Sequence, residues 1–156
     1  MGDKMKIENI MSKNLVIANA YDSIKDISIL MKQYDIGFIP LSKENIITGV
    51  ITDRDLVINA LYNGAKEKDS VIKYMNKNII AIDMSESIEY ALETMAKEQI
   101  KRLLIKETEE NKIVGILSLS DIINNTNINV SETLKSIWTI HKNTNEYQTE
   151  IDEFYL

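Results

Sequence analysis

The alternation of apolar and polar positions divides most of the chain into two similar series of short segments. In each series a short apolar run precedes a stretch with helical periodicity, and two more apolar runs and a second amphipathic stretch follow. We predict strands at 15–18, 38–41 and 46–52 in the first series and at 79–82, 103–105 and 113–118 in the second. Strands this apolar need helices packed on them, which indicates the α/β (α+β) class.

Capping signals place the helices of the first series. Ser23 is followed three residues later by Asp26, which is the spacing of a capping box, and Gly37 is expected to end that helix. Asp53 is expected to cap a second helix that stops near Asn63-Gly64. The apolar stripe of the first helix consists of Ile24, Ile27, Met31 and Tyr34.

The second series repeats this organisation, and a third region follows it. Ser87 is expected to cap a helix, 121–125 opens the next one, and Ser131 is expected to cap a C-terminal helix. The stripe of the first of these helices consists of Ile88, Ala91, Leu92 and Met95. The C-terminal stripe consists of Leu134, Ile137, Trp138 and His141, continued by Tyr147, Ile151, Phe154 and Tyr155 in an acidic segment.

The two series are an internal repeat. Shifted by 64 residues, Met11-Ser12-Lys13-Asn14-Leu15 falls on Met75-Asn76-Lys77-Asn78-Ile79. After a two-residue insertion, Gly49-Val50-Ile51-Thr52 matches Gly115-Ile116-Leu117-Ser118. The chain is therefore expected to form two β-α-β-β-α repeats that face each other about a pseudo-twofold axis. The expected divisions are repeat 1 at 7–66, repeat 2 at 67–128 and a C-terminal helical, acidic extension at 129–156.

Composition excludes several kinds of chemistry. The chain has no cysteine and one histidine, which excludes disulfides, thiolate metal sites, cysteine nucleophiles and a multi-histidine zinc site within one chain. Its formal charge of −6 argues against general binding to nucleic acid or anionic lipid. It has no run of 18 apolar residues and no secretory signal at the N-terminus, so we expect a cytoplasmic protein with no membrane partner.

The strongest chemical signal is a motif at the end of the third strand of each repeat. In 49–55 an apolar strand ends at a hydroxyl and runs into a helix start, where backbone N–H groups favour anions. Thr52 supplies the hydroxyl, Arg54 a charged fork for phosphate, and Asp55 acceptors for a vicinal diol, a set that suits a ribose phosphate. The second copy has Ser118, Ser120 and Asp121 at the matching positions.

Simpler interpretations compete with this one. A Thr or Ser followed by Asp at a helix start is also an ordinary cap, although duplication at matched positions favours binding. The basic pair Lys101-Arg102 is equally compatible with a solvated strand start, and His141 is better explained by packing beside Trp138. No Ser-His-Asp set, Walker loop or dinucleotide glycine fingerprint is present, so we predict no catalytic residues and no metal ligands.

Taken together, these motifs resemble a tandem pair of cystathionine-beta-synthase (CBS) domains, or Bateman module. Each repeat has a short apolar strand, a helix opened by Ser-Ile and carrying Met31 or Met95, an apolar strand, and a Gly-apolar-apolar-Thr/Ser-x-x-Asp motif. The resemblance covers about residues 7 to 126. It departs from the family at the first strands, where Ile17 and Ala81 stand in place of the frequent Thr, and at Leu104, where Pro is usual.

The resemblance implies two repeats packed through their sheets, with two clefts that commonly hold AMP, ADP, ATP, S-adenosylmethionine or cyclic dinucleotides. By position, the aspartates would bind ribose, the hydroxyls phosphate or ribose, the arginines phosphate, and the first-strand backbone the base. The implied nucleotide-binding residues are Ile17, Ala18, Thr52, Arg54, Asp55, Ala81, Ile82, Arg102, Ser118, Ser120 and Asp121.

We therefore expect a regulatory small-molecule sensor, not an enzyme, with an adenosine nucleotide as regulatory ligand and no required cofactor. The expected partners are a second copy in a homodimer and an effector protein in trans. The alternative is a ligand-free structural or interaction module that acts through its C-terminal apolar helix. An enzyme is the weakest hypothesis, because the sequence pairs no nucleophile with a base.

Overall fold

A computed structural model describes residues 5–139 of the chain. The predictions made for His141, Tyr147, Ile151, Phe154 and Tyr155 lie outside these residues. The described residues form two three-stranded sheets with helices, one sheet for each repeat of the sequence. Within them, no helix is long and apolar enough to cross a bilayer.

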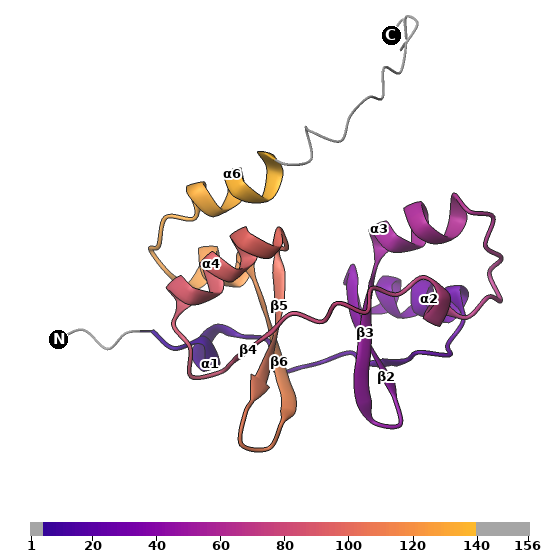
Figure 1. Cartoon of the computed structure of the whole chain (residues 1–156), viewed down its shortest axis with the longest axis horizontal. Coiled ribbons are helices and arrows are strands. Elements are labelled where there is room, and N and C mark those ends of the chain that lie inside the picture. The colour runs from indigo at the N-terminus through magenta and orange to yellow at the C-terminus, as the bar shows by residue number, and fades with distance from the viewer. Residues whose placement is uncertain (1–4, 140–156) are drawn as a thin grey trace, which may run out of the picture. The chain divides into compact units, whose positions relative to one another are not determined.

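The first repeat forms the sheet β1-β2-β3 (Figure 1). Its elements are β1 (Ala18–Asn19), α2 (Ile24–Tyr34), β2 (Phe38–Lys43), β3 (Ile46–Thr52), α3 (Asp53–Asp55) and a π-helical turn, η1 (Leu56–Leu61). β1 runs parallel to β2, and β2 is antiparallel to β3. The turn between β2 and β3 is tight because Glu44 and Asn45 both adopt positive φ.

The first hydrophobic core lies between this sheet and the helices. Helix α2 contributes its predicted stripe, since Ile24, Ile27 and Met31 are all buried, whereas Tyr34 is exposed. The remaining buried members are Ala18, Ala20, Ile39, Leu41, Ile51, Leu56, Ala60 and Val71. Burying a branched apolar side chain contributes about 1.5–3 kcal/mol, so this cluster is the main source of stability in the repeat.

The second repeat forms the sheet β4-β5-β6. Its elements are β4 (Ala81–Asp83), α4 (Ile88–Glu98), β5 (Arg102–Glu107), β6 (Lys112–Ser118) and α5 (Leu119–Asn125). Strand β4 runs parallel to β5. The predicted stripe of α4 is confirmed, because Ile88, Ala91, Leu92 and Met95 are all buried.

The segments that open the two repeats of the sequence are exchanged. Asn76 exchanges two backbone hydrogen bonds with Val50 of β3, at 2.9 and 2.8 Å. Ser12 does the same with Ile116 of β6, at 2.9 and 3.0 Å. The edge strands β3 and β6 are therefore each paired at one residue with a segment that opens the other repeat of the sequence, which shortens the exposed template for strand pairing at those edges.

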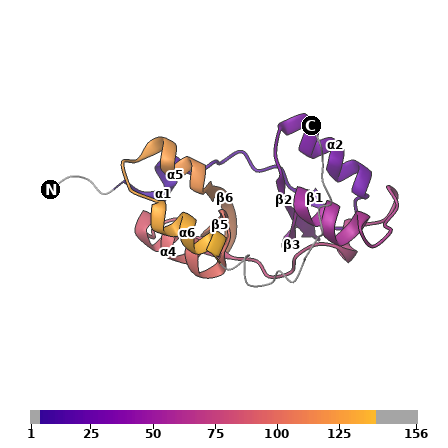
Figure 2. The same ribbon diagram turned by 90° about the horizontal axis from the view of Figure 1, so that it is seen from above.

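Short helices continue this exchange. The 3₁₀ turn η2 (Val71–Lys73) begins repeat 2 in the sequence, yet its Val71 is fully buried in the first core. The helix α1 (Ile7–Ile10) begins repeat 1 and packs against α5, as Figure 2 shows. The packed cores and the repeats of the sequence thus differ in their opening segments.

Gly49 is required where these segments meet β3. A Cβ at this position would lie 2.7 Å from the sulfur of Met75 and 2.9 Å from the carbonyl oxygen of Asn76. Both distances are shorter than van der Waals contact. Gly64 has a different role, because its φ of +78° is strained for other residues while the space around it is open.

By Cα packing the chain separates into two compact units. Among the described residues, one contains 5–11, Met84–Leu103 and 117–139, and the other contains Ser12–Asp83 and Leu104–Ile116. Each strand-end motif lies within one unit, because Thr52 to Asp55 belong to the second unit and Ser118 to Asp121 to the first.

Strand and helix boundaries correct several predictions. The predicted strands 15–18 and 79–82 are wrong in their starts, since the observed strands are Ala18–Asn19 and Ala81–Asp83. Gly37 does not end α2, because Asp35 adopts the left-handed conformation at φ 52° and caps the helix. A short polar side chain tolerates that conformation better than most residues.

Helix starts need a second set of corrections. Asp53 is not a cap, because Thr52 occupies the N-cap position of α3. Similarly, α5 begins at Leu119, two residues before the prediction, with Ser118 as its cap. Ser131 lies inside α6 (Ser131–Thr139) instead of capping it.

The C-terminal helix α6 packs against α4 (Figure 2). Its buried face is formed by Thr133 and Ile137, with Val130 buried just before the helix, and Leu134 is half-buried. Trp138 is 54% exposed, so the predicted stripe is wrong at this position. The helix therefore covers its own chain through the face that contains Ile137.

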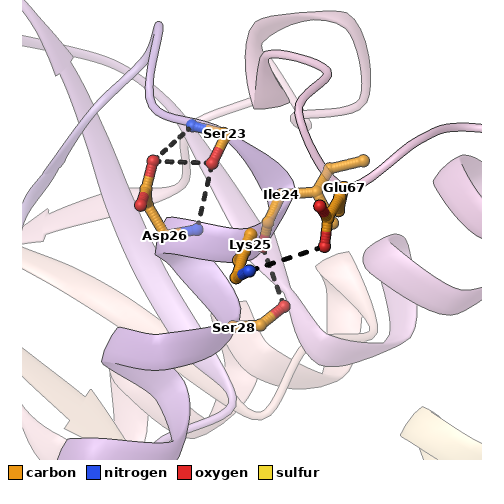
Figure 3. Close-up of polar contacts among 6 residues, drawn as sticks. All are labelled: Ser23, Ile24, Lys25, Asp26, Ser28 and Glu67. Carbon is orange, nitrogen blue, oxygen red and sulfur yellow. Dashed lines mark hydrogen bonds and ion pairs between the residues drawn. The ribbon is translucent and has the colours of Figure 1, made fainter.

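The start of α2 is held by a reciprocal capping box, which Figure 3 shows. The Asp26 N–H donates to Ser23 Oγ at 3.1 Å, and the Ser23 N–H and hydroxyl donate to Asp26 Oδ2 at 3.3 and 2.6 Å. The predicted capping box is confirmed. The hydroxyl of Ser23, followed by its N–H and the Lys25 ammonium, lowers the pKa of Asp26.

Candidate functional site

The first strand-end motif is built on a capping box. The Thr52 hydroxyl and N–H donate to Asp55 Oδ2 at 2.7 and 3.0 Å, and the Asp55 N–H returns a hydrogen bond to Thr52 Oγ1 at 3.1 Å. Asn59 Nδ2 donates to the other oxygen, Asp55 Oδ1, at 3.0 Å. Both carboxylate oxygens of Asp55 are therefore engaged, although a carboxylate has about four acceptor positions in all.

Arg54 lies beside this box on the exposed side of α3. No ion pair involves its guanidinium within residues 5–139. The backbone N–H of Arg54 donates to Asp53 Oδ1 at 2.7 Å, and the backbone N–H of Asp53 donates to the carbonyl of Gly37 at 3.1 Å. Thr52, Arg54 and Asp55 are thus brought together, with a cation available for an anionic ligand.

The second strand-end motif repeats the box with one difference. The Ser118 hydroxyl and N–H donate to Asp121 Oδ2 at 2.6 and 2.7 Å, and the Asp121 N–H donates to Ser118 Oγ at 3.1 Å. The hydroxyls of Ser118 and Ser120 lie 2.8 Å apart. Asn125 Nδ2 donates to the backbone carbonyl of Asp121, so Oδ1 of this carboxylate has no partner among the described residues.

Of the predicted base-binding residues, Ala18 lies on β1, Ile17 directly precedes that strand, and Ala81 and Ile82 lie on β4. Ala18 is paired with Leu41, whereas Thr52 is paired with Phe38 at the other end of β2. Ala18 and Thr52 are three residues apart along the strands and two strand spacings apart across the sheet. Each of these two perpendicular separations is about 10 Å. The sheet thus separates the two groups by roughly 14 Å along the diagonal. Ala18 and Ile82 are buried, Ile17 is exposed and Ala81 is half-buried.

Two cations stand at the start of β5, close to the second motif. Arg102 is exposed at the first position of the strand. The carbonyl of the preceding residue, Lys101, accepts a hydrogen bond from the N–H of Leu119 at 2.9 Å, and Leu119 directly follows Ser118. The Nζ atom of Lys101 lies 4.9 Å from the centroid of the Trp138 ring. This ring contact is typical of a cation–π interaction.

A cavity of about 710 Å³ lies between the start of α4 and the segment that follows α5. None of the predicted binding residues lines it. Its walls are formed by Met5, Lys6, Ser85, Glu86, Ser87, Ile88, Glu89, Asn124, Asn125, Thr126, Asn127 and Ile128. The hydrogen-bonding groups that suit a ribose phosphate are at the strand-end motifs, so the cavity is not our candidate site.

Two functional details were not predicted from the sequence. Asn59 follows Asp55 by four residues, and that spacing on a helix could have indicated its contact with the carboxylate. The contact between Lys101 and Trp138 joins residues far apart in the chain, and no local signal marks it.

Comparison with known proteins places these features in a family. The sequence profile of the CBS domain matches residues 7–61 and 70–126, which is most of the chain. The protein therefore belongs to the CBS domain family and carries a tandem pair of these domains. It is 29% identical over 116 residues to the CBS domain-containing protein YhcV of Bacillus subtilis, which covers 74% of this chain and 81% of that protein.

Solved structures agree with this assignment. An uncharacterized conserved protein from Pyrococcus horikoshii superposes with a TM-score of 0.73 and 28% identity, over 83% of this chain and 97% of that one. The CBS domain pair of protein MJ0100, in complex with 5′-methylthioadenosine and S-adenosyl-L-methionine, gives a TM-score of 0.69 at 23% identity. That match covers 78% of this chain and 95% of the other and supports the fold.

Proposed function

We propose that this protein is a non-catalytic sensor that binds an adenosine-containing small molecule at its strand-end motifs. The observation that carries the proposal is the paired hydroxyl and carboxylate at the end of β3 and again at the end of β6. The same box caps a helix and presents acceptors suited to a ribose diol. The ligands of the MJ0100 domain pair, both adenosine compounds, support this chemical class.

The two motifs favour different ligands. The first has the guanidinium of Arg54, which suits phosphate, but both oxygens of Asp55 already accept hydrogen bonds. The second has Ser120 in place of that arginine and an open oxygen on Asp121. We therefore expect phosphorylated ligands to prefer the first motif, and adenosines without a phosphate to prefer the second.

Calorimetric titration tests the proposal. The ligands are AMP, ADP, ATP, cyclic di-AMP, S-adenosylmethionine and methylthioadenosine, titrated into the parent protein, Asp55→Asn and Asp121→Asn. A lost hydrogen bond to a charged group weakens affinity by roughly tenfold to a hundredfold. Asp55→Asn should weaken the binding of phosphorylated ligands, and Asp121→Asn that of methylthioadenosine.

Glu109→Gln is the matched control. Glu109 is exposed in the turn between β5 and β6, so its replacement removes one negative charge without touching either motif. Its effect measures the general attraction of a less acidic protein for anions. If no adenosine compound binds the parent protein below about millimolar, the sensor proposal fails and a ligand-free interaction module replaces it.

The output of such a sensor is proposed to pass to a second copy or to an effector protein. Ile137 cannot supply that surface as expected, because it is 2% exposed and packed within its own chain. An exposed apolar surface lies instead on η1 and just after it, at Val57, Leu61 and Tyr62. Light scattering tests this proposal, because a mass equal to one chain at all concentrations would exclude the homodimer.

A further inference from the structure

Lys101 and Trp138 connect the C-terminal helix to the second strand-end motif. The side chain of Lys101 contacts the Trp138 ring, and its backbone carbonyl holds the N–H of Leu119. Leu119 follows Ser118, the hydroxyl residue of the motif. One residue therefore contacts both α6 and the start of α5.

Helix α6 is fixed in a position that presents Trp138 to this lysine. Ile137 is buried where α6 packs on α4, and Gln99 Nε2 reaches the carbonyl of Ser136 at 3.5 Å. The Trp138 ring is 54% exposed, so burial alone does not explain its location. The Lys101 ammonium is the polar partner that the structure gives it.

The first repeat arranges its cation differently. The position that matches Lys101 is Gly37, where a Cβ would lie 2.6 Å from Asp53 Oδ2, so this position has no room for a side chain unless Asp53 moves. Its cation is Arg54 on α3 instead. In the second repeat Ser120 replaces that arginine, and the cations Lys101 and Arg102 stand at the start of β5.

We propose that Lys101 binds the phosphate of a ligand at the second motif and that Trp138 holds its ammonium aside until such a ligand binds. This inference rests on the proposed function. An ammonium is a compact, strongly hydrated charge on a flexible stem, and stacking over a ring turns it away from other partners. Phosphate binding and the contact with Trp138 therefore compete for the same group.

The competition has two consequences with opposite signs. A charge-assisted hydrogen bond to phosphate is stronger than an exposed cation–π contact, so a phosphorylated ligand withdraws Lys101 from the indole. By linkage, the contact with the indole weakens the binding of that ligand by the same factor by which the ligand weakens the contact. Trp138 is thus a positioning residue, and a purely structural role would not make its removal improve binding.

The single tryptophan of the chain makes the test direct, because intrinsic fluorescence excited beyond the adenine absorption reports on Trp138 alone. ATP should change the fluorescence of the parent protein at the higher concentrations that also fill the second motif, whereas methylthioadenosine, which has no phosphate, should not. Lys101→Met should abolish the change and weaken ATP binding at the second motif by about tenfold. Trp138→Leu should tighten it by about two- to fivefold in calorimetry.

Lys97→Met is the control, because Lys97 is an exposed lysine in the last turn of α4 and its ammonium lies 3.9 Å from the Glu98 carboxylate. It should leave the ATP-induced fluorescence change intact. If ATP at concentrations that fill both motifs in calorimetry leaves the fluorescence unchanged, or if Trp138→Leu weakens ATP binding at the second motif, this inference is wrong while the sensor proposal stands. If no adenosine compound binds the parent protein, the sensor proposal fails and this inference fails with it.

Discussion

The first helices of the two repeats start with the same serine cap but are supported by different parts of the chain. At α2, the N–H groups of Ile24 and Lys25 donate to the carbonyls of Asp69 and Glu67, at 2.9 and 3.0 Å. The Lys25 ammonium also lies 3.6 Å from the Glu67 carboxylate (Figure 3). At α4, the residues Ser87, Ile88 and Glu89 at the start of the helix line the cavity, and the helix packs against α6.

The sequence accounts for part of this difference. The position that matches Lys25 is Glu89, which carries the opposite charge, so the second repeat does not keep the cation of this ion pair. Duplication has therefore kept the helix cap and the strand-end motif in both repeats, while the supporting contacts have diverged. The connection between the repeats supports the first helix, and the C-terminal extension supports the second.

Truncation of the α6 contact should have the largest effect. Ile137→Ala removes a side chain that is 2% exposed, which should lower the free energy of unfolding by about 2–5 kcal/mol. Ile29→Ala, the same change at an exposed position of α2, should cost less than about 0.5 kcal/mol. Urea unfolding measures both, and equal losses would show that α6 does not support the second repeat.

A side chain at Gly49 tests the support of the first repeat. Gly49→Ala places a Cβ against Met75 and Asn76, so we expect a loss of about 1–3 kcal/mol from overpacking. Gly64→Ala is the comparison, because it meets open space and costs stability only through its positive φ, by about 1 kcal/mol. If Gly49→Ala proved the milder of the two in urea unfolding, the close approach of 75–76 to β3 would be in doubt.

The serine caps should differ by a smaller amount. Ser23→Ala breaks a reciprocal capping box and should cost about 1–2 kcal/mol. Ser87→Ala should cost about 0.5–1 kcal/mol, because Ser87 Oγ accepts one hydrogen bond, from the N–H of Tyr90, and a tyrosine cannot return it as Asp26 does. Thermal unfolding of the two variants side by side would rank them, and the reverse order would contradict the comparison.

The smallest effect concerns pH. The pKa of Asp26 is lowered in the folded protein, chiefly by the Ser23 hydroxyl, so its stabilisation is present at neutral pH and is lost as the pH falls through that lowered pKa. Ser23→Ala should therefore flatten the loss of stability between about pH 5 and pH 2, whereas Ser87→Ala should not. Urea midpoints measured across this range would reveal an unchanged slope if the capping box has no such role.

Local signals in the sequence predicted much of the fold. Strand β3 has the predicted bounds, 46–52, because a polar turn precedes its apolar residues and a hydroxyl residue, Thr52, ends them. The caps Ser23 and Ser87 were predicted for the same reason. The helix ends at Asp35 and Gln99 were not predicted, because both residues adopt a left-handed conformation that the sequence usually marks with a glycine.

Contacts between distant segments account for what the sequence did not predict. The pairing of Ser12 with Ile116 depends on where the folded repeats place their sheet edges, and the sequence around neither residue indicates its partner. At the candidate site, the motif residues could be found because they follow a strand in both repeats. The contact of Lys101 with Trp138 could not, because Trp138 lies outside the repeat and has no counterpart to compare.

The exchange of opening segments also has a consequence for the order in which the protein can be made. A chain leaves the ribosome from its N-terminus, at about 5–20 residues per second. Ser12 emerges early, but its partner Ile116 is among the last residues of the second repeat to appear. Until then the segment around Ser12 has no edge to pair with, and the β3 edge likewise waits for Asn76. A chain whose synthesis stops between the two repeats thus has the β3 edge unpaired, and the buried residues of α1, Ile7 and Ile10, lack the α5 surface on which they pack.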